Sequence, residues 1–386
     1  MAKRGQGEGT ISKRTDGTWW ARITIGKDEN GKQKRKAFYG KTRKDVQEKL
    51  TAALNDIKQE TYTDSKNITI AKWCDIWLKE YKKKSVKPKT YMYLECCVRL
   101  YIKPKLGHYK LKELKNVMVQ ALVNDMHDQD LSLSYIRHTR TTLRGALAQA
   151  IENGLLMKNV AVNIQLPAEE SEKKMRILTV DEQKRFIEIA KNMYHGRVLV
   201  FLLGTGLRIG EALALKWDDV DFESANLQVN KTQIDVKDPD DPESKFNIQY
   251  ASPKTKTSVR EVPLLPEIIN LLEQIQEEQV EMKSAFGQAY SKEGLIFGSR
   301  QGERIFSNTV RKSLAKINKE MGLEGFTAHG CRHTFATRCF ERGVELRVVQ
   351  EMLGHADINI TARIYTHVQD EKKKDAMTKL EGMIEL

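Results

Sequence analysis

With 386 residues, of which 40% are hydrophobic, the chain is long enough to form two or three domains with substantial cores. It has no run of about 18 apolar residues, and its start, MAKRGQGEG, has no apolar stretch behind the basic residues, so we expect a cytoplasmic protein with neither a membrane span nor a secretory signal. Basic residues (65) exceed acidic ones (52) by 13, and residues 1–44 alone hold 13 basic against four acidic residues, which indicates a polyanionic partner, nucleic acid before membrane.

The basic start predicts a small folded module over residues 1–62 rather than a solubilising tail. GTISKR, TWWARITIG and KQKRKAFYG read as three short strands, separated by the turn signals TDG and KDENGK and followed by a helix over 41–59. Alternation puts Trp19, Ala21 and Ile23 on the face that packs on this helix. The other face is polar, basic and aromatic, as in a sheet that enters a DNA groove. The sequence leaves the facing of the third strand open. The residues that we assign to DNA contact are Trp20, Arg22, Thr24, Lys34 and Lys36.

Residues 66–165 predict a helical domain of four helices. In TIAKWCDIWLKEYKK, Ile70, Trp73 and Trp77 recur at helical spacing. In the last helix, within SLSYIRHTRTTLRGALAQAIENGL, three arginines recur at i, i+3 and i+7 and so share one face. A solvated surface is the ordinary interpretation of such a face, but beside the other basic features we expect phosphate contact. These arginines are Arg137, Arg140 and Arg144.

Residues 166–177 carry the charged stretch LPAEESEKKMRI, which predicts an interdomain linker. The mixed region 178–386 has the size of one catalytic domain. We therefore expect a multidomain protein, mostly α with small β elements, in which an N-terminal three-stranded sheet plus helix and a four-helix domain precede a mixed α+β catalytic domain.

RVLVFLLGTGLRIGEALAL, at residues 197–215, resembles a dinucleotide-binding turn, but Ile209 stands where the fingerprint needs its third glycine. A helix, a tight glycine turn and a second helix fit better. Arg208 then lies near the start of the second helix, where it can meet a phosphate. Glu211 is three residues further on and can hold Arg208 through a charge-assisted bond.

HGCRHTFATRCFERG, at residues 329–343, is dense in cations. His329 and His333 have the spacing of a zinc pair, but Gly330 stands where the metalloprotease motif has glutamate. We therefore predict no metal. Arg332 among two histidines and a second arginine makes a cluster that repels itself and is settled by an anion. The chain's five cysteines form no CxxC pair, so we expect reduced thiols rather than disulfides or a zinc ribbon.

Two further stretches carry candidate residues. In YASPKTKTSVREVPL, VREVPL reads as a strand, and we expect a hairpin with Lys254 or Lys256 near its tip. In LGHADINITARIYTHV, Tyr365 follows His355 by ten residues. A tyrosine is most often an amphipathic packing residue, and it acts as a nucleophile only where nearby cations or a base activate it.

Taken together, TGLRIGEALAL, SPKTKTSVREVPL, HGCRHTFAT and LGHADINITARIYTH resemble the tyrosine recombinase (phage-type integrase) family. The whole layout is similar to integrases of conjugative transposons and temperate phages of Gram-positive bacteria. The resemblance implies that Arg208 and Arg332 grip the scissile phosphate, that Lys254 is the general acid, with Lys256 as the alternative, and that Tyr365 is the nucleophile. It also makes His329 the general base and His355 a phosphate donor.

The implied reaction forms a 3′-phosphotyrosine that keeps the energy of the phosphodiester bond, so neither a metal, another cofactor nor ATP is needed. The resemblance further implies double-stranded DNA partners with core and arm-type sites, a homotetramer on DNA, a four-way (Holliday) junction intermediate, and an accessory excisionase or DNA-bending protein. The tail after residue 370 docks either on its own domain or on a neighbouring protomer. The alternatives are a type IB topoisomerase-like nicking-closing enzyme and a non-catalytic DNA-binding regulator derived from an integrase.

Overall fold

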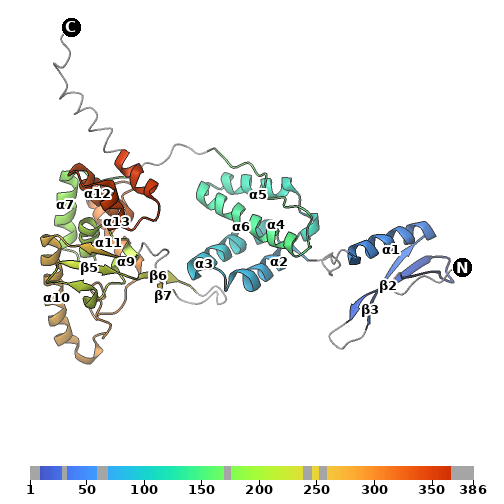
Figure 1. The fold of residues 1–386 in the computed structure, drawn as a ribbon, viewed down its shortest axis with the longest axis horizontal. Coiled ribbons are helices and arrows are strands. Elements are labelled where there is room, and N and C mark those ends of the chain that lie inside the picture. The colour runs from blue at the N-terminus through green and yellow to red at the C-terminus, as the bar shows by residue number, and fades with distance from the viewer. Residues whose placement is uncertain are drawn as a thin grey trace, which may run out of the picture. The chain divides into compact units, whose positions relative to one another are not determined.

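The computed structural model describes residues 9–27, 33–58, 68–168, 175–237, 246–251 and 259–366. The chain divides into two compact units, Met1–Glu170 and Ser171–Leu386, whose elements are labelled in Figure 1. The division lies within the segment that the sequence marks as a linker. In the described part of the chain, no helix is both long enough and apolar enough to cross a bilayer.

The N-terminal part of the first unit is a three-stranded antiparallel sheet with one helix. Strands β1 (Thr10–Lys13), β2 (Trp19–Lys27) and β3 (Gln33–Gly40) pair in the order β1-β2-β3, and α1 (Arg43–Lys58) follows. Ala21 and Ile23 of β2 are buried against Val46 and Leu50 of α1. The predicted alternation of β2 is therefore confirmed, and among the described residues of this module α1 covers this face of the sheet alone.

Four helical segments form the rest of the first unit. The first is α2 (Ile70–Ile76), continued by a π-helical turn (Trp77–Lys82). The second runs from α3 (Pro88–Cys97) through a π-helical turn (Val98–Ile102) into α4 (Lys103–Leu106). The third and fourth segments are α5 (Asn116–Asp128) and α6 (Leu133–Glu152), and a 3₁₀ turn (Leu111–Glu113) precedes α5. The Trp73 indole is buried in the core and donates to the carbonyl oxygen of Ala146 at 2.8 Å, which locks the first helix to the last.

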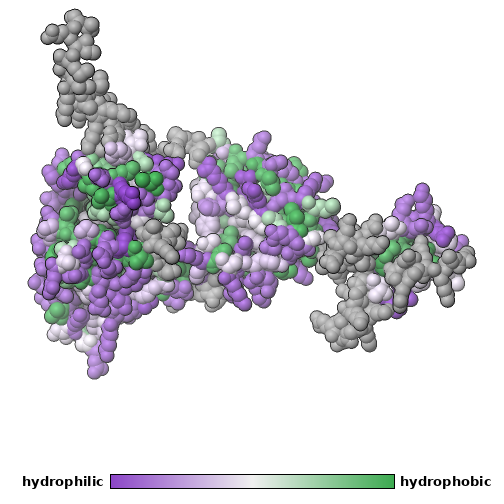
Figure 2. Space-filling model, viewed as in Figure 1, coloured by the Kyte–Doolittle hydropathy of each residue, from purple (hydrophilic) through white to green (hydrophobic). Residues whose placement is uncertain are grey.

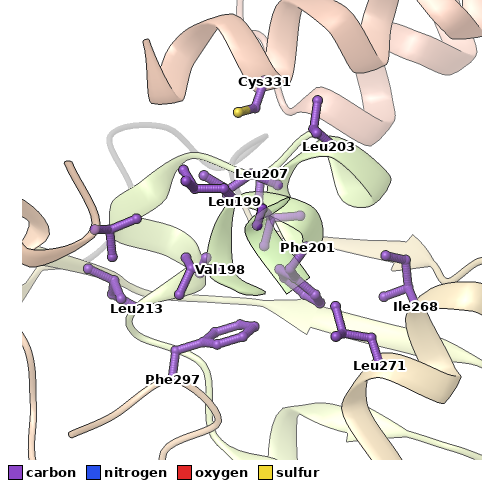
Figure 3. Close-up of a cluster of buried hydrophobic side chains, with 14 of the residues drawn as sticks. Val198, Leu199, Phe201, Leu203, Leu207, Leu213, Ile268, Leu271, Phe297 and Cys331 are labelled. Atoms are coloured by element: carbon purple, nitrogen blue, oxygen red, sulfur yellow. The ribbon is translucent and has the colours of Figure 1, made fainter. Parts of the chain in front are cut away.

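The second unit is built around the apolar helix α8 (Arg197–Thr205). Figure 3 shows Val198, Leu199, Phe201 and Leu203 of this helix within the main core. The helices around it are α7 (Val180–Lys191), α9 (Ile209–Ala212), α10 (Pro266–Phe286), α11 (Ser307–Met321), α12 (Ala328–Glu341) and α13 (Leu346–Leu353). Residues 358–366 are also helical. Short 3₁₀ turns lie at Trp217–Asp219 and Gly287–Ala289.

Two small sheets cover part of this core. Strands β4 (Val220–Asp221), β5 (Asn226–Val229) and β8 (Arg260–Pro263) form one sheet, in the order β4-β5-β8. Strands β6 (Thr232–Val236) and β7 (Asn247–Ala251) form the other. The strands on either side of residues 252–258 thus pair in different sheets, β7 with β6 and β8 with β5. The predicted hairpin of these two strands around the lysines is wrong, and Lys254 and Lys256 themselves lie outside the described residues.

The exposed side of α10 is acidic, in contrast to the basic chain as a whole. Glu273, Glu277 and Glu281 are exposed at intervals of four residues, which places them in one row along the helix. Figure 2 shows hydrophilic side chains over most of the visible side of this helix. Because DNA phosphates repel carboxylates, this side of the second unit is unsuited to DNA contact.

Candidate active site

The site begins at the corner between α8 and α9. Gly206 caps α8 in the left-handed conformation, with φ of +67°. A Cβ atom at this position would lie 2.5 Å from Phe335 Cδ1 and 2.8 Å from Leu353 Cδ2. The turn therefore needs glycine both for its backbone angle and for the close approach of α12 and α13. It brings Arg208 to the N-terminal cap of α9.

Arg208 is held by Glu211, as the spacing predicts. The backbone N–H of Arg208 donates to Glu211 Oε2 at 2.9 Å, and Arg208 Nη1 donates to Oε1 at 2.7 Å. The Glu211 side chain is 6% exposed, whereas that of Arg208 is 40% exposed. One edge of the guanidinium is thus fixed from within the protein, and the side chain as a whole stays accessible to an anion.

Arg332 of α12 is fixed by backbone carbonyls rather than by a carboxylate. Its side chain is buried, and Nη1 donates to the Gly206 carbonyl at 2.9 Å while Nη2 donates to the Leu353 carbonyl at 2.6 Å. Within the described residues, its Nε has no hydrogen-bond partner. Burial first, and then the charge of Arg208, lowers the pKa of Arg332 to about 9. The guanidinium therefore remains charged at neutral pH. Its Nη1 bond ends on the carbonyl of Gly206, two residues before Arg208.

Arg260 is a member of the site that the sequence reasoning missed. Its Nε donates to the Met352 carbonyl at 2.6 Å, and its Nη1 and Nη2 lie 3.4 and 3.1 Å from the two carboxylate oxygens of Glu211. Arg260 lies on the same face of β8 as the buried Val262, and Leu264, just after the strand, is also buried. The sequence did contain a signal for Arg260, namely a charged residue on the apolar face of a strand. Such a charge needs a partner inside the protein.

His355 lies in the turn after α13, which Gly354 makes possible with φ of +64°. The His355 side chain is buried, and its Nδ1 lies 2.9 Å from the hydroxyl oxygen of Thr361. Burial, followed by the positive charges of Arg332 and Arg208, lowers the pKa of His355 to about 3. The ring is therefore neutral at pH 7, and it is close enough to both arginines to respond to their charge.

His329 and His333 lie one turn apart on α12. Their rings meet edge to face, with centroids 4.9 Å apart. Burial, and then the charges of Arg332 and Arg208, lowers the pKa of His329. Burial, and then His329 and Arg332, lowers the pKa of His333 to about 4. Both rings are therefore mainly neutral at pH 7 and able to accept a proton.

Tyr365 lies in the helical residues 358–366, on the turn after Thr361. Its ring packs edge to face on Phe340 of α12, with centroids 5.1 Å apart and an interplanar angle of 76°. The same helix α12 carries His329 and Arg332. The packing role that is ordinary for a tyrosine is thus present, and it ties Tyr365 to the helix that supplies the cationic cluster.

The structure therefore brings four of the six predicted catalytic residues close together, namely Arg208, His329, Arg332 and His355. Their closeness shows in the effect that the charges of the arginines have on the pKa values of the other members. Tyr365 follows on the helix that starts just after His355.

The open face of the N-terminal sheet carries the predicted aromatic and basic side chains. The Arg22 guanidinium lies over the Trp20 ring, 5.5 Å from its centroid, and Thr24 is exposed. Thr24 pairs with Arg35, which is also exposed. Arg35 therefore belongs to this face, and the sequence reasoning left it out because it could not fix the register of the third strand.

The prediction for Lys36 is corrected by this register. Lys36 pairs with Ile23, whose side chain packs on α1. Paired residues lie on the same side of a sheet, so Lys36 lies on the helix side and not beside Trp20 and Arg22. Lys34 pairs with Gly26 beyond a register shift, and its side chain lies outside the described residues.

The three arginines of α6 differ from one another. Arg140 is partly buried, and its Nη2 donates to the Val162 carbonyl at 2.8 Å. It therefore ties α6 to the segment that follows the helix. Arg137 and Arg144 are exposed, and they stay predictions for phosphate contact.

Comparison with known proteins agrees with this layout. Residues 176–372 match the phage integrase family, and residues 69–127 match the phage integrase N-terminal SAM-like domain. The chain is 34% identical over 376 residues to a tyrosine recombinase XerC-like protein of Caldanaerobacter subterraneus subsp. tengcongensis, covering 94% of this chain and 95% of that protein. It is 24% identical over 389 residues to the ICEBs1 integrase of Bacillus subtilis, covering 97% of this chain and 100% of that one.

Solved structures share the fold. A Tn1549 transposon integrase in complex with transposon right end DNA matches with a TM-score of 0.65 at 22% identity, over 81% of this chain and 100% of that chain. A lambda integrase tetramer bound to a Holliday junction matches with a TM-score of 0.58 at 18% identity, over 94% of this chain and 96% of that chain.

Proposed function

This chain belongs to the phage integrase family, and from that premise we propose that it is the integrase of a mobile element, which inserts and excises the element by site-specific recombination. It is an enzyme, a tyrosine recombinase that cleaves and rejoins DNA strands. Relatives at similar full-length coverage include the ICEBs1 integrase and the integrase of Staphylococcus phage L54a, which supports a conjugative element or a phage as the source.

The observation that carries the proposal is the convergence of two arginines and two neutral histidines. Arg332 donates to the carbonyl of Gly206, in the turn that leads to Arg208. The charges of both arginines lower the pKa of His329 and of His355. Such a cluster of fixed positive charges and neutral imidazoles suits a phosphodiester, because attack at phosphorus builds negative charge on the non-bridging oxygens.

In the proposed reaction the Tyr365 oxygen attacks the scissile phosphorus. His329 accepts the phenolic proton, because its lowered pKa keeps the ring neutral at pH 7. Arg208 and Arg332 stabilise the charge on the phosphate, and neutral His355 donates one hydrogen bond to it. Lys254 gives a proton to the departing 5′ oxygen. The product is a 3′-phosphotyrosine and a free 5′ hydroxyl, and attack by a 5′ hydroxyl of a second DNA reverses the step and joins new partners.

Double-stranded DNA is the substrate. The solved structures with this fold include integrases bound to DNA and a lambda integrase tetramer bound to a Holliday junction, which supports a homotetramer that acts through such a junction. We assign arm-type sites to the N-terminal module and core sites to the helical and catalytic domains, divided at 1–62, 66–165 and 178–386. An accessory excisionase or DNA-bending protein completes the proposed set of partners, and the reaction takes place in the cytoplasm.

The test is the Tyr365→Phe variant, which keeps the ring on Phe340 and removes the nucleophilic oxygen. We expect it to bind core-site DNA as the unchanged protein does and to form no covalent adduct on a denaturing gel. An adduct formed by this variant would overturn the assignment. A supercoil relaxation assay beside a two-site recombination assay separates an integrase from a nicking-closing enzyme, which relaxes supercoils without pairing sites.

A further inference from the structure

The hydrogen bond between His355 and Thr361 has a chemical consequence for the site. His355 is neutral at pH 7, since its pKa lies at about 3. A neutral imidazole carries one N–H, on either Nδ1 or Nε2, and the other nitrogen accepts. His355 can therefore donate to a phosphate through Nε2 only in one of its two tautomers.

The backbone of His355 is fixed before its ring is considered. The His355 N–H donates to the Gln350 carbonyl at 3.2 Å, and Gln350 Nε2 donates to the His355 carbonyl at 3.0 Å. With the backbone held on both sides and the side chain buried, the ring contact that remains is Nδ1 to Thr361 Oγ1 at 2.9 Å.

The hydroxyl of Thr361 determines which tautomer is preferred. Thr361 is fully buried, and within the described part of the chain Nδ1 of His355 is the hydrogen-bond partner of its hydroxyl. If Nδ1 carried the proton, the hydroxyl would accept it and its own O–H would be left buried without an acceptor. A buried donor without a partner is strongly unfavourable. If Nδ1 accepts, the O–H is satisfied.

Other helical threonines show that this arrangement is particular. The Thr366 hydroxyl donates to the Ala362 carbonyl at 2.9 Å, and the Thr141 hydroxyl donates to the Arg137 carbonyl at 2.8 Å. These hydroxyls use the backbone acceptor four residues earlier, as threonine in helices commonly does. Thr361 instead meets a titratable ring across the turn that precedes its helix.

We propose that Thr361 is a positioning residue that donates its hydroxyl proton to His355 Nδ1, keeps the imidazole proton on Nε2, and so makes His355 a hydrogen-bond donor to the scissile phosphate. Thr361 precedes Tyr365 by four residues on one helix, so the same bond links the placement of the nucleophile's helix to the tautomer of His355. The role in catalysis rests on the proposed function, whereas the tautomer does not.

The test compares Thr361→Val, which has the same shape without the hydroxyl, with Thr361→Ser, which keeps it. Thr366→Val is the matched control, because it removes a hydroxyl from the same helix that bonds only to the backbone. In the full-length protein with ¹⁵N-labelled histidine, and with the His355 signal assigned by its loss in His355→Gln, we expect the Nε2–H tautomer in the unchanged protein and in Thr361→Ser. Thr361→Val should shift the ring towards Nδ1–H.

In single-turnover adduct formation on core-site DNA, Thr361→Val should be slower by about tenfold or more, the change expected when a preorganised donor is lost. Thr361→Ser and Thr366→Val should stay within about threefold, and DNA affinity should not change in any of them.

Three results would overturn the inference. These are an Nδ1–H ring in the unchanged protein, a Thr361→Val variant with unaltered tautomer, or an altered tautomer with an unaltered cleavage rate. If Thr361→Val proves unfolded in a thermal melt, the tautomer of the unchanged protein still decides. Failure of the unchanged protein to form any adduct would instead refute the proposed function and leave the tautomer result standing.

Discussion

Glu211 is a buried carboxylate that pairs with Arg208 at 2.7 Å and with Arg260 at 3.1 Å. Burial, the largest influence, raises its pKa, but the charges and hydrogen bonds of Arg260 and Arg208 outweigh burial and lower the pKa from the usual 4.5. Its carboxylate therefore holds Arg208 and Arg260 together, since it contacts both the cap of α9 and the start of β8.

Glu211→Gln should destabilise the fold, because it keeps the shape and leaves two arginines without their shared negative charge. Breaking a buried ion pair of this kind lowers the free energy of unfolding by about 3 kcal/mol. The control is Glu293→Gln, which breaks a more exposed pair with Arg304, whose side chains are 33% and 35% exposed. The expected loss there is at most about 1 kcal/mol. Urea titrations at pH 7 measure both, and equal losses would contradict the role of Glu211.

The same variant predicts a pH dependence. Because the folded pKa of Glu211 lies below its unfolded value, the stabilisation is complete above the unfolded value and is lost as pH falls through the folded one. The stability difference between the unchanged protein and Glu211→Gln should thus be full at pH 6 to 7 and shrink below about pH 4. A constant difference over this range would mean that the carboxylate charge is not what stabilises the site.

Lys254 is tested by changing the leaving group rather than the protein alone. If Lys254 protonates the departing 5′ oxygen, Lys254→Ala should cleave ordinary core-site DNA slowly, and DNA with sulfur in place of that oxygen should restore the rate, because a thiolate leaves without a proton. The loss expected for a general acid is about 10²- to 10⁴-fold. If the sulfur-containing DNA restored cleavage by Lys256→Ala but not by Lys254→Ala, the general acid would be Lys256.

At the level of single residues, the sequence predicted side chains whose neighbours are close along the chain. Arg208 and Glu211 are three residues apart on one short helix, and their bond follows from that spacing. Arg260 and Thr361 were missed. Arg260 of β8 meets Glu211 of α9, 49 residues away in sequence, and Thr361 meets His355 across a turn. One sequence does not reveal which distant segments meet.

Among the secondary-structure elements, the turn at Gly206 connects α8 to Arg208 and offers its carbonyl to Arg332. The left-handed φ of +67° and the approach of Phe335 and Leu353 both depend on the missing Cβ. Displacing this turn therefore moves both arginines of the cluster together.

Gly206→Ala should lower stability and cleavage, and Gly322→Ala is its matched control. Gly322 caps α11 with φ of +66°, and a Cβ there meets nothing within 4 Å. Both variants share the left-handed strain of about 1 to 2 kcal/mol, so any excess loss in Gly206→Ala measures the clash. In thermal melts, Gly206→Ala should lose more melting temperature than Gly322→Ala. In adduct assays, only Gly206→Ala should lose cleavage. Similar behaviour of the two variants would contradict this.

Helices and their order followed from periodicity, but strand pairing did not. The predicted hairpin around Lys254 assumed that adjacent strands pair with each other, whereas β7 pairs with β6 and β8 with β5. The apolar stripe of α2 was predicted, but the π-helical turns at Trp77–Lys82 and Val98–Ile102 were not. A wider turn changes the spacing of apolar residues too little to be detected over so short a segment.

On the scale of the whole molecule, the excess of positive charge lies towards the N-terminal module, where 13 basic and four acidic residues occupy positions 1–44. Deleting residues 1–62 should spare cleavage at a core site, because the proposed catalytic residues and the helical domain 66–165 all lie outside the deletion, and should abolish binding to a separate arm-type site. Gel shifts with both DNA sites measure the two activities. Loss of core-site cleavage in the deletion would contradict the division of labour.

A finer comparison uses the two faces of the sheet. Arg22→Ala, on the open face, should weaken arm-site binding and reduce the salt dependence by about one phosphate contact. Lys36→Ala, on the helix side, removes the same charge but should weaken arm-site binding less than Arg22→Ala does. The reverse order would mean that DNA lies against the other face.

The placement of Arg332 bears on how long the protein persists in a cell. Its guanidinium is removed from water and donates to two carbonyls. In the reaction that we propose, the phosphate of the target site is the anion that neutralises this charge. A ligand that binds only the folded state stabilises it by mass action, and copies that are unbound unfold and are degraded more readily. If the proposed function holds, copies bound to their DNA site are therefore protected from unfolding and degradation relative to unbound copies.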